Sequence, residues 1–234
     1  MPRTNVEYAT DQITVYRSCP YDCKYCWAKL PLFKYRIARG MYDPVEEAKR
    51  YLKVKGKRTI VVSFTTDPYP PIEFESNRTR KVLEVLASSH HKVMILTKNP
   101  CLALRDIDVM LNGSAEFWLG TTITVIPDSS ARMFEPKAPP PSQRIAAIKA
   151  AKYLGLKTWI SIEPIIPYYT NIYEIIYRTR DFTDFYVFGA LNYPTQTLGK
   201  QFKKHLKEYY KTIFNIFNLK KPHFIKKELR KYLT

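Results

Sequence analysis

Short and almost continuous apolar runs alternate along this chain with longer amphipathic segments. The runs cover residues 13–19, 59–65, 92–98, 116–124, 157–166 and 185–192. Most of them lack the strict polar and apolar alternation of a half-exposed strand, and they are typical of parallel strands covered on both faces. The pattern therefore predicts six parallel strands.

The segments between these runs have the spacing and boundary signals of helices. Helices are expected near residues 43–55, 77–89, 100–112, 142–154 and 170–180. Asp43, Pro44 and Glu46 form the pattern of an N-cap, a first-turn proline and a capping-box glutamate, and Gly155 ends the fourth helix. Alternating strands and helices predict an α/β fold, an open partial (β/α)6 TIM-type barrel, over residues 1–194.

Residues 195–234 have a different pattern and no further strand is expected there. One apolar stripe at helical spacing comprises Phe202, Leu206, Tyr209, Ile213 and Phe217, and a second follows Pro222 at Phe224, Ile225, Leu229 and Tyr232. An unburied stripe of this kind is an aggregation hazard. We therefore expect a basic C-terminal helical extension that packs on the barrel and turns its lysines to solvent.

The formal net charge of +17 is concentrated in two blocks. Residues 24–58 contain eleven Lys or Arg against three acids, and residues 195–234 contain eleven against two, so these blocks carry the whole excess. Such clustering indicates a polyanion partner, with nucleic acid or a nucleotide as the expected substrate. No segment is long and apolar enough to span a bilayer, and no secretion signal is recognised, so we expect a cytoplasmic protein without a membrane partner.

Three of the four cysteines lie within eight residues, Cys19, Cys23 and Cys26, at the spacing C-x3-C-x2-C. A structural zinc site needs four ligands, and the remaining candidates, Cys101 and the histidines, are far away in sequence. A chain of 234 residues also buries a core without disulfides. The three thiols are therefore expected to be reduced and to hold three irons of a [4Fe-4S] cluster, which leaves the fourth iron open for a substrate.

Polar residues follow the predicted strands at their carboxyl ends, where ligands bind in parallel α/β folds. These residues are Cys19, Thr65, Thr66, Asp67, Thr97, Lys98, Thr122, Thr124, Glu163 and Asn192. Each of them alone is an ordinary loop residue. Together they converge on the sheet edge that carries the cysteines, and they predict one site.

These motifs resemble the radical S-adenosylmethionine (SAM) superfamily, in particular its spore photoproduct lyase-like branch. The cysteine spacing with Tyr25 before the last cysteine is similar to the superfamily's cluster loop. The likeness continues over about residues 12–193 through FTTDPYPPIE (64–73), ILTKN (95–99), RDID (105–108), FEP with RIAAIKAAKYLG (134–155) and SIEPIIP (161–167). It implies a cluster bound by Cys19, Cys23 and Cys26, and reductive cleavage of SAM to a 5′-deoxyadenosyl radical.

The resemblance also implies where SAM binds. Lys98, Thr66 and Thr122 lie where the branch contacts SAM, and Tyr25 lies where the superfamily places its loop against the adenine. A point cation such as Lys98 suits the methionine carboxylate. With the strand-end acids, the predicted cofactor-binding residues are Tyr25, Thr66, Asp67, Lys98, Thr122 and Glu163.

One position departs from the branch. Phe64 stands where spore photoproduct lyase has a cysteine that returns a hydrogen atom to the product radical, and phenylalanine has no labile hydrogen. Direct reversal of a thymine dimer by that route is therefore not expected. Cys101 and Tyr69 are the nearest alternative donors by strand-end position, although Cys101 also fits a small buried residue at a helix start. Our preferred hypothesis needs no hydrogen donor from the protein.

The sequence thus predicts a radical SAM enzyme of the lyase or transferase type that abstracts hydrogen from a nucleic-acid or nucleotide substrate. A ferredoxin or flavodoxin would supply the electron. A peptide or small metabolite is the alternative substrate. A non-catalytic iron–sulfur protein that binds nucleic acid is the alternative class, but a structural cluster needs no polar SAM pocket.

Overall fold

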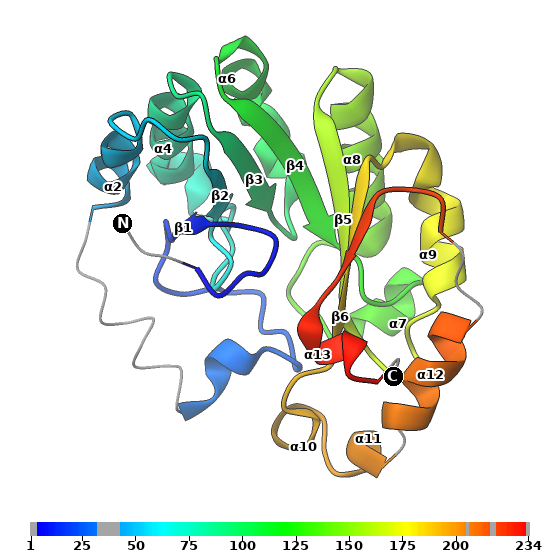
Figure 1. The fold of residues 1–234 in the computed structure, drawn as a ribbon. Coiled ribbons are helices and arrows are strands. Elements are labelled where there is room, and N and C mark those ends of the chain that lie inside the picture. Colours follow the sequence, from blue (N-terminus) through cyan, green and yellow to red (C-terminus); the bar gives the residue numbers. More distant parts are fainter. Residues whose placement is uncertain (1–3, 32–42, 205, 216–218, 233–234) are drawn as a thin grey trace.

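A computed structural model describes residues 4–31, 43–204, 206–215 and 219–232. Within these residues, seven parallel strands form one sheet whose spatial order equals the chain order, and the sheet curls into a half-barrel (Figure 1). The strands are β1 (Asp11–Ile13), β2 (Thr59–Val62), β3 (Lys92–Leu96), β4 (Glu116–Thr122), β5 (Lys157–Ile165), β6 (Phe185–Ala190) and β7 (His223–Ile225). The predicted α/β fold, an open partial barrel of the TIM type, is confirmed.

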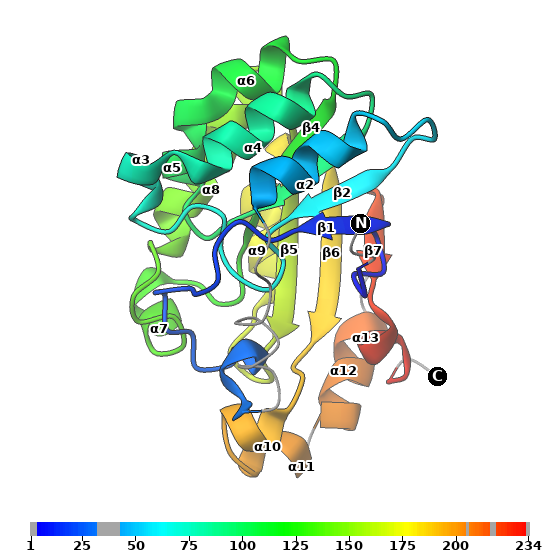
Figure 2. The same cartoon turned by 90° about the vertical axis from the view of Figure 1, so that its left-hand side faces the viewer.

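Helices cover the outer face of the sheet, and the last of them lie at the carboxyl ends of the strands (Figures 1 and 2). They are α2 (Pro44–Tyr51), α3 (Glu73–Ser76), α4 (Arg78–Ala87), α5 (Pro100–Ala103), α6 (Ile107–Asn112), α7 (Asp128–Arg132), α8 (Pro141–Tyr153), α9 (Ile172–Thr179), α10 (Pro194–Thr197), α11 (Gln201–Lys204), α12 (Leu206–Asn215) and α13 (Lys227–Arg230). Short 3-10 turns occur at Trp27–Lys29, Leu104–Asp106 and Arg180–Phe182. Within the described residues, none of these helices has the length and apolarity needed to cross a membrane.

Two helix boundaries follow the predicted signals. The Asp43 side chain accepts a hydrogen bond from the backbone N–H of Val45, which caps α2. Gly155 has a φ of 103° just beyond α8, a left-handed conformation that glycine adopts without steric cost. The predicted helix over 100–112 is instead divided into α5, a 3-10 turn and α6.

The first strand is shorter and earlier than the predicted 13–19. After Ile13 the chain leaves the ladder, because the backbone N–H of Val15 donates to the Oγ of Ser63 at 3.0 Å and not to a strand carbonyl. Val15 and Tyr16 remain buried in this irregular segment. The apolar run therefore predicted the burial of Ile13, Val15 and Tyr16 correctly, but residues 17–19 are exposed and the strand ends at Ile13.

The expectation of an all-helical extension is wrong at its second stripe. His223–Ile225 adds β7 to the edge of β6, with Val187 opposite Phe224 in the register. Phe224 and Ile225 thus supply a strand, whose backbone pairs an otherwise open sheet edge. The first stripe is helical, and Leu206 is buried, while Phe217 lies outside the described residues.

Large side chains fill the amino-terminal half of the barrel interior. Trp159 of β5 is fully buried and its Nε1–H donates to the carbonyl of Ile95 at 3.1 Å. A Cβ at Gly120 would lie 2.4 Å from the Trp159 ring, so only glycine leaves room for it. Since side chains alternate along a strand, Ser161 and Glu163 share the inner face of β5 with Trp159. The space above the tryptophan, at the carboxyl ends, is left for a cavity.

Candidate active site

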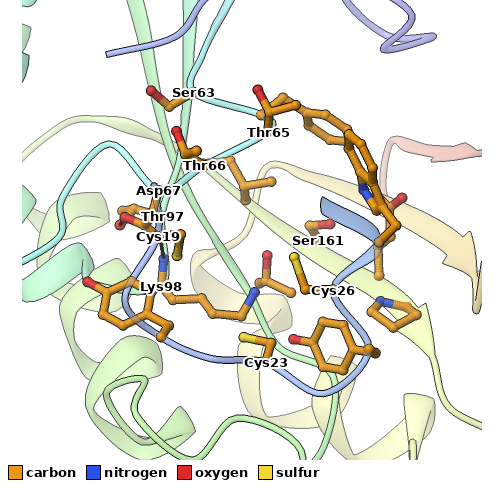
Figure 3. Close-up of a pocket in the computed structure, with 18 of the residues that line it drawn as sticks. Cys19, Cys23, Cys26, Ser63, Thr65, Thr66, Asp67, Thr97, Lys98 and Ser161 are labelled. Carbon is orange, nitrogen blue, oxygen red and sulfur yellow. Dashed lines mark hydrogen bonds between the residues drawn. The ribbon is translucent and has the colours of Figure 1, made fainter. Parts of the chain in front are cut away.

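A cavity of about 150 Å³ opens at the carboxyl ends of the strands (Figure 3). The predicted site residues that line it are Cys19, Cys23, Tyr25, Cys26, Thr66, Asp67, Lys98, Thr122 and Glu163. Segments far apart in sequence thus meet at one place. Phe64 and Asn192 also line the cavity.

The loop that carries the three cysteines is fixed by its neighbours. The Tyr21 hydroxyl donates to the carbonyl of Tyr69 at 2.7 Å, and the N–H of Lys24 donates to the carbonyl of Phe134 at 2.8 Å. Cys23 is buried, Cys26 is partly buried and Cys19 is exposed. The loop therefore presents its thiols from fixed backbone positions.

The thiols are held in a partly desolvated environment. Burial raises the pKa of Cys23 to about 12, although the positive charge of Lys98 acts in the opposite direction. Burial, followed by the Asp67 carboxylate, also raises the pKa of Cys19. Thiolates are the form that binds iron, so metal binding here would have to displace protons.

The donor set fits an iron–sulfur cluster better than a single metal ion. Among the described residues, no three cysteine, histidine or acidic side chains converge tightly enough to hold one ion. A cluster instead takes one thiolate at each of several irons. Three thiols on one loop, all facing one cavity, suit that arrangement.

Lys98 extends from the end of β3 between Cys23 and Cys26 (Figure 3). Its Nζ lies 3.9 Å from Oε1 of Glu135 and 5.5 Å from the centre of the Tyr25 ring. Burial alone would lower the pKa of Lys98, but Cys23 and Glu135 raise it above its ordinary value. The ammonium group is therefore kept charged inside the cavity.

Glu135 balances this charge in a buried network. Arg144 of α8 lies with its Nη2 2.5 Å from Oε2 of Glu135, and both side chains are 1% exposed. The Tyr25 hydroxyl and the Thr124 hydroxyl also donate to Glu135. Burial would raise the pKa of this carboxyl, but Arg144 and Lys98 hold it below its usual value. The sequence showed the FEP motif but gave no signal that Glu135 meets Lys98.

Asp67 holds the ends of β2 and β3 together. Its carboxylate accepts hydrogen bonds from the Thr97 hydroxyl, the Lys98 N–H and the Tyr69 N–H at 2.6, 2.7 and 2.8 Å. Burial raises the pKa of Asp67, although these bonds act against that shift. Asp67 therefore fixes the backbone from which Lys98 extends.

The threonines and Ser161 complete the polar wall. The Thr66 hydroxyl donates to the carbonyl of Tyr16 at 2.7 Å, and the Thr122 carbonyl accepts from Arg144 at 2.9 Å. Ser161 lines the cavity and its buried Oγ has no hydrogen-bond partner among the described residues. Ser161 was not predicted from the sequence. It lies two residues before Glu163, and residues at this spacing share one face of a strand, so the pattern could have indicated it.

Glu163 is paired with a lysine from the far end of the chain. The Nζ of Lys226, just after β7, lies 2.6 Å from Oε1 of Glu163 and 4.9 Å from the centre of the Phe64 ring. Gly189 leaves space for the carboxylate, since a Cβ there would lie 2.7 Å from the Glu163 Cγ. The expectation that the lysines of the extension face solvent is wrong for Lys226, which is buried.

The two alternative hydrogen donors lie elsewhere. Tyr69 is fully buried and its hydroxyl donates to Asp106 at 3.0 Å. Cys101 is exposed at the start of α5, so the interpretation of a small buried residue is wrong. Neither side chain lines the cavity described above.

A parallel half-barrel with a polar cavity at its strand ends has the architecture of an α/β enzyme. Residues 13–177 match the Radical SAM superfamily, and the chain belongs to that superfamily. The membership predicted from the motifs is therefore confirmed.

Several known proteins are similar to this chain. The uncharacterized protein MJ0683 of Methanocaldococcus jannaschii is 32% identical over 93% of this chain and 83% of its own length. Spore photoproduct lyase complexed with dinucleoside spore photoproduct matches with a TM-score of 0.61 and 16% identity, over 80% of this chain and 58% of that one. Streptococcus suis SuiB bound to precursor peptide SuiA matches with a TM-score of 0.62 and 13% identity, over 92% of this chain and 48% of that one. At these identities, the two solved structures show the shared fold, and the chain spans only about half to three-fifths of their lengths.

Proposed function

We propose that this protein is a radical SAM enzyme of the lyase or transferase type that abstracts a hydrogen atom from a nucleic-acid or nucleotide substrate. The observation that carries the proposal is the convergence of Cys19, Cys23, Cys26 and Lys98 on one cavity. A cytoplasmic ferredoxin or flavodoxin is the proposed reductant, because each reductive cleavage of SAM consumes one electron.

The three cysteines are proposed to hold a [4Fe-4S] cluster with one iron open. When bound, the cluster supplies one electron to SAM, which splits into methionine and a 5′-deoxyadenosyl radical. The protein's part is to orient the cofactor. Lys98 suits the methionine carboxylate because its ammonium group is a charged hydrogen-bond donor in a partly desolvated cavity. Tyr25, Thr66, Asp67, Thr122 and Glu163 are proposed as the remaining cofactor residues.

Anaerobic reconstitution tests the cluster assignment. The protein should bind one four-iron cluster and form 5′-deoxyadenosine when SAM and a reductant are added. Alanine at Cys19, Cys23 or Cys26 should abolish both properties, because two thiolates do not retain the cluster. Cys101→Ala is the matched control, since Cys101 lies outside the cavity and should be dispensable. Stoichiometric zinc without SAM cleavage would refute the assignment.

A nucleic-acid substrate is supported by the charge of the C-terminal helices. The neighbouring folds include one complex with a dinucleoside photoproduct and one with a peptide, so the fold alone does not choose between them. Lys204, Lys207 and Lys211 are exposed on α11 and α12. Cationic side chains that face solvent favour a polyanion over a neutral peptide.

Salt titration tests this choice. The logarithm of nucleic-acid affinity should fall by roughly 0.7–0.9 per phosphate neutralised as the logarithm of the salt concentration rises. Reversing Lys204, Lys207 and Lys211 to glutamate should flatten that slope. The control reverses three exposed lysines on other elements, Lys81, Lys149 and Lys157. Equal slopes for the two triple variants would favour the peptide or metabolite alternative.

The placement of the alternative donors supports quenching without a hydrogen atom from the protein. Phe64 lines the cavity, whereas Cys101 and Tyr69 do not. Under this proposal, Cys101→Ala keeps full turnover and an unchanged product. Aberrant adducts in that variant, with 5′-deoxyadenosine still formed, would identify Cys101 as the donor.

A further inference from the structure

Three exposed tyrosines lie just beyond the carboxyl ends of β5 and β6. Tyr168 and Tyr169 follow β5, and Tyr193 follows Asn192, which lines the cavity. These tyrosines are 69%, 40% and 42% exposed. We call Tyr168, Tyr169 and Tyr193 the tyrosine rim.

The backbone and the neighbouring rings hold the tyrosine rim in place. Tyr168 and Tyr193 have φ angles of 67° and 53°, a left-handed conformation that is costly for a bulky residue and persists only where the surroundings impose it. The Tyr168 ring centre lies 5.2 Å from that of Tyr209, and the Tyr169 ring centre lies 6.3 Å from that of Phe202. The rings of Tyr168 and Tyr169 are thus anchored on one side and open to solvent on the other, and Tyr193 is placed by its backbone at the start of α10.

The same ring contacts join the rim to the basic helices. Phe202 lies in α11 and Tyr209 in α12, and the exposed lysines of these helices are Lys203, Lys204, Lys207 and Lys211. Residues 200–215 contain five lysines and one acid. Both helices lie below the carboxyl ends of the strands (Figure 1). Aromatic and cationic groups, which the sequence could not place together, are therefore neighbours beside the cavity.

We propose that the tyrosine rim and these lysines bind single-stranded nucleic acid, with bases stacked on the tyrosines and phosphates along the lysines. A single strand offers unpaired bases to an aromatic surface, whereas a duplex keeps its bases inside the stack. The cavity opens at the strand ends beside the rim, and a base reaches such a site only after it has left its stack. This inference rests on the proposed nucleic-acid substrate and narrows it to unpaired nucleotides.

Binding of labelled oligonucleotides to the reconstituted full-length protein tests the inference. The probes are a single strand of mixed sequence and a duplex that contains it, each made as DNA and as RNA. Wild-type protein should prefer the single strand at equal salt. Tyr168→Ala should weaken single-strand binding by about 5- to 150-fold, the range for loss of one stacked base, and should leave duplex binding unchanged. Tyr168→Phe, which keeps a ring, should retain the affinity.

Two further variants distinguish the loss of a stacked base from a general effect of removing an exposed tyrosine ring or of backbone strain. Tyr193→Asn removes the second ring but keeps a residue that tolerates the left-handed backbone, and it should also weaken single-strand binding. Tyr177→Ala is the matched control, because Tyr177 on α9 is also 69% exposed but lies outside the rim. It should bind as the wild type does.

The outcomes distinguish this inference from the proposed function. If wild-type protein binds single strand and duplex with equal affinity, and Tyr168→Ala binds as Tyr177→Ala does, the proposed role of the tyrosine rim is overturned and the nucleic-acid proposal stands. If the protein binds neither single strand nor duplex, the rim and the nucleic-acid proposal are both overturned. Preference for DNA or for RNA among single strands is compatible with the rim and identifies which polymer is the substrate.

Discussion

Lys98 shows how much one side chain depends on groups that are distant in sequence. Its backbone is fixed by Asp67, and its charge is partly balanced by Glu135, which in turn is held by Arg144. Removal of Lys98 leaves the Glu135 and Arg144 pair intact. Its removal should therefore weaken the binding of the ligand and leave the stability of the fold unchanged.

Lys98→Ala should weaken SAM binding while iron content stays unchanged. A hydrogen bond to a charged group contributes about 1.5–3 kcal/mol, which corresponds to roughly a 10- to 150-fold loss of affinity. Equilibrium binding of SAM to the reconstituted protein measures this loss. Lys92→Ala provides the control, because Lys92 begins β3 at its amino end, whereas Lys98 lies beyond the carboxyl end of this strand. Unchanged SAM affinity in Lys98→Ala would remove Lys98 from the site.

Among single residues, the sequence predicted those site residues that a short motif or the end of a predicted strand marks. Cys19, Cys23 and Lys98 follow predicted strands or a short motif, and strand ends in a parallel sheet share one edge. Glu135 and Lys226 escaped prediction because the site residues that they meet, Lys98 and Glu163, lie 37 and 63 residues away, and these contacts are set by tertiary packing.

At the scale of elements, the segment after β2 is held by a group of buried ion pairs. Glu73 of α3 and Asp106 before α6 are both fully buried. Arg105 contacts Glu73 and Asp106 at 2.8 Å each, and Arg80 contacts Asp106 at 3.2 Å. The Tyr16 and Tyr69 hydroxyls donate into the same group. The segments that carry Tyr16, Glu73, Arg80 and Asp106 are therefore tied together.

Arg105→Ala should destabilise the protein by about 2–3 kcal/mol. The full cost of breaking an enclosed pair is about 3–5 kcal/mol, but the guanidinium is 24% exposed and solvent screens part of the interaction. Urea unfolding measures the change. Arg178→Ala, which removes an exposed pair with Glu174 on α9, should cost less than about 0.5 kcal/mol. Similar costs for both variants would show that the buried group does not stabilise the fold.

The sequence predicted whether a segment is a helix or a strand where its apolar residues repeat clearly. It predicted the ends of these elements less well. The strands β2 to β6 begin at the predicted residues because their runs are bounded by polar segments. The predicted helix over 100–112 failed because the turn at Leu104–Asp106 brings the Asp106 carboxylate to Arg80. The hydrophobic period of a segment does not predict which contacts its side chains make with another segment.

At the scale of the whole molecule, the C-terminal segment closes the barrel wall beside the cavity. β7 pairs with β6, and the N–H of Lys226 donates to the carbonyl of Phe188 at 2.9 Å. The Tyr210 hydroxyl of α12 donates to the carbonyl of Ile165 at 2.8 Å and accepts from the N–H of Leu191 at 2.9 Å. The extension, predicted as helices packed on the barrel, thus contributes backbone to the sheet and one charge to the site.

Lys226→Ala tests whether this closure matters for the site. The substitution leaves Glu163, whose side chain is 16% exposed, without its cation, and we expect a loss of about 3 kcal/mol in stability together with weaker SAM binding. Lys227→Ala is the control, since Lys227 is the next residue, carries the same charge and is exposed. Unfolding and SAM titration of both variants give the comparison.

The double variant Lys226→Met with Glu163→Gln decides how Lys226 acts. If its role is to neutralise and hold Glu163, replacing both charges should recover most of the stability, because no buried charge is left unpaired. SAM binding should then stay weak only if the Glu163 carboxylate itself contacts the cofactor. Equal behaviour of Lys226→Ala and Lys227→Ala would instead mean that the C-terminal segment covers the barrel without shaping its cavity.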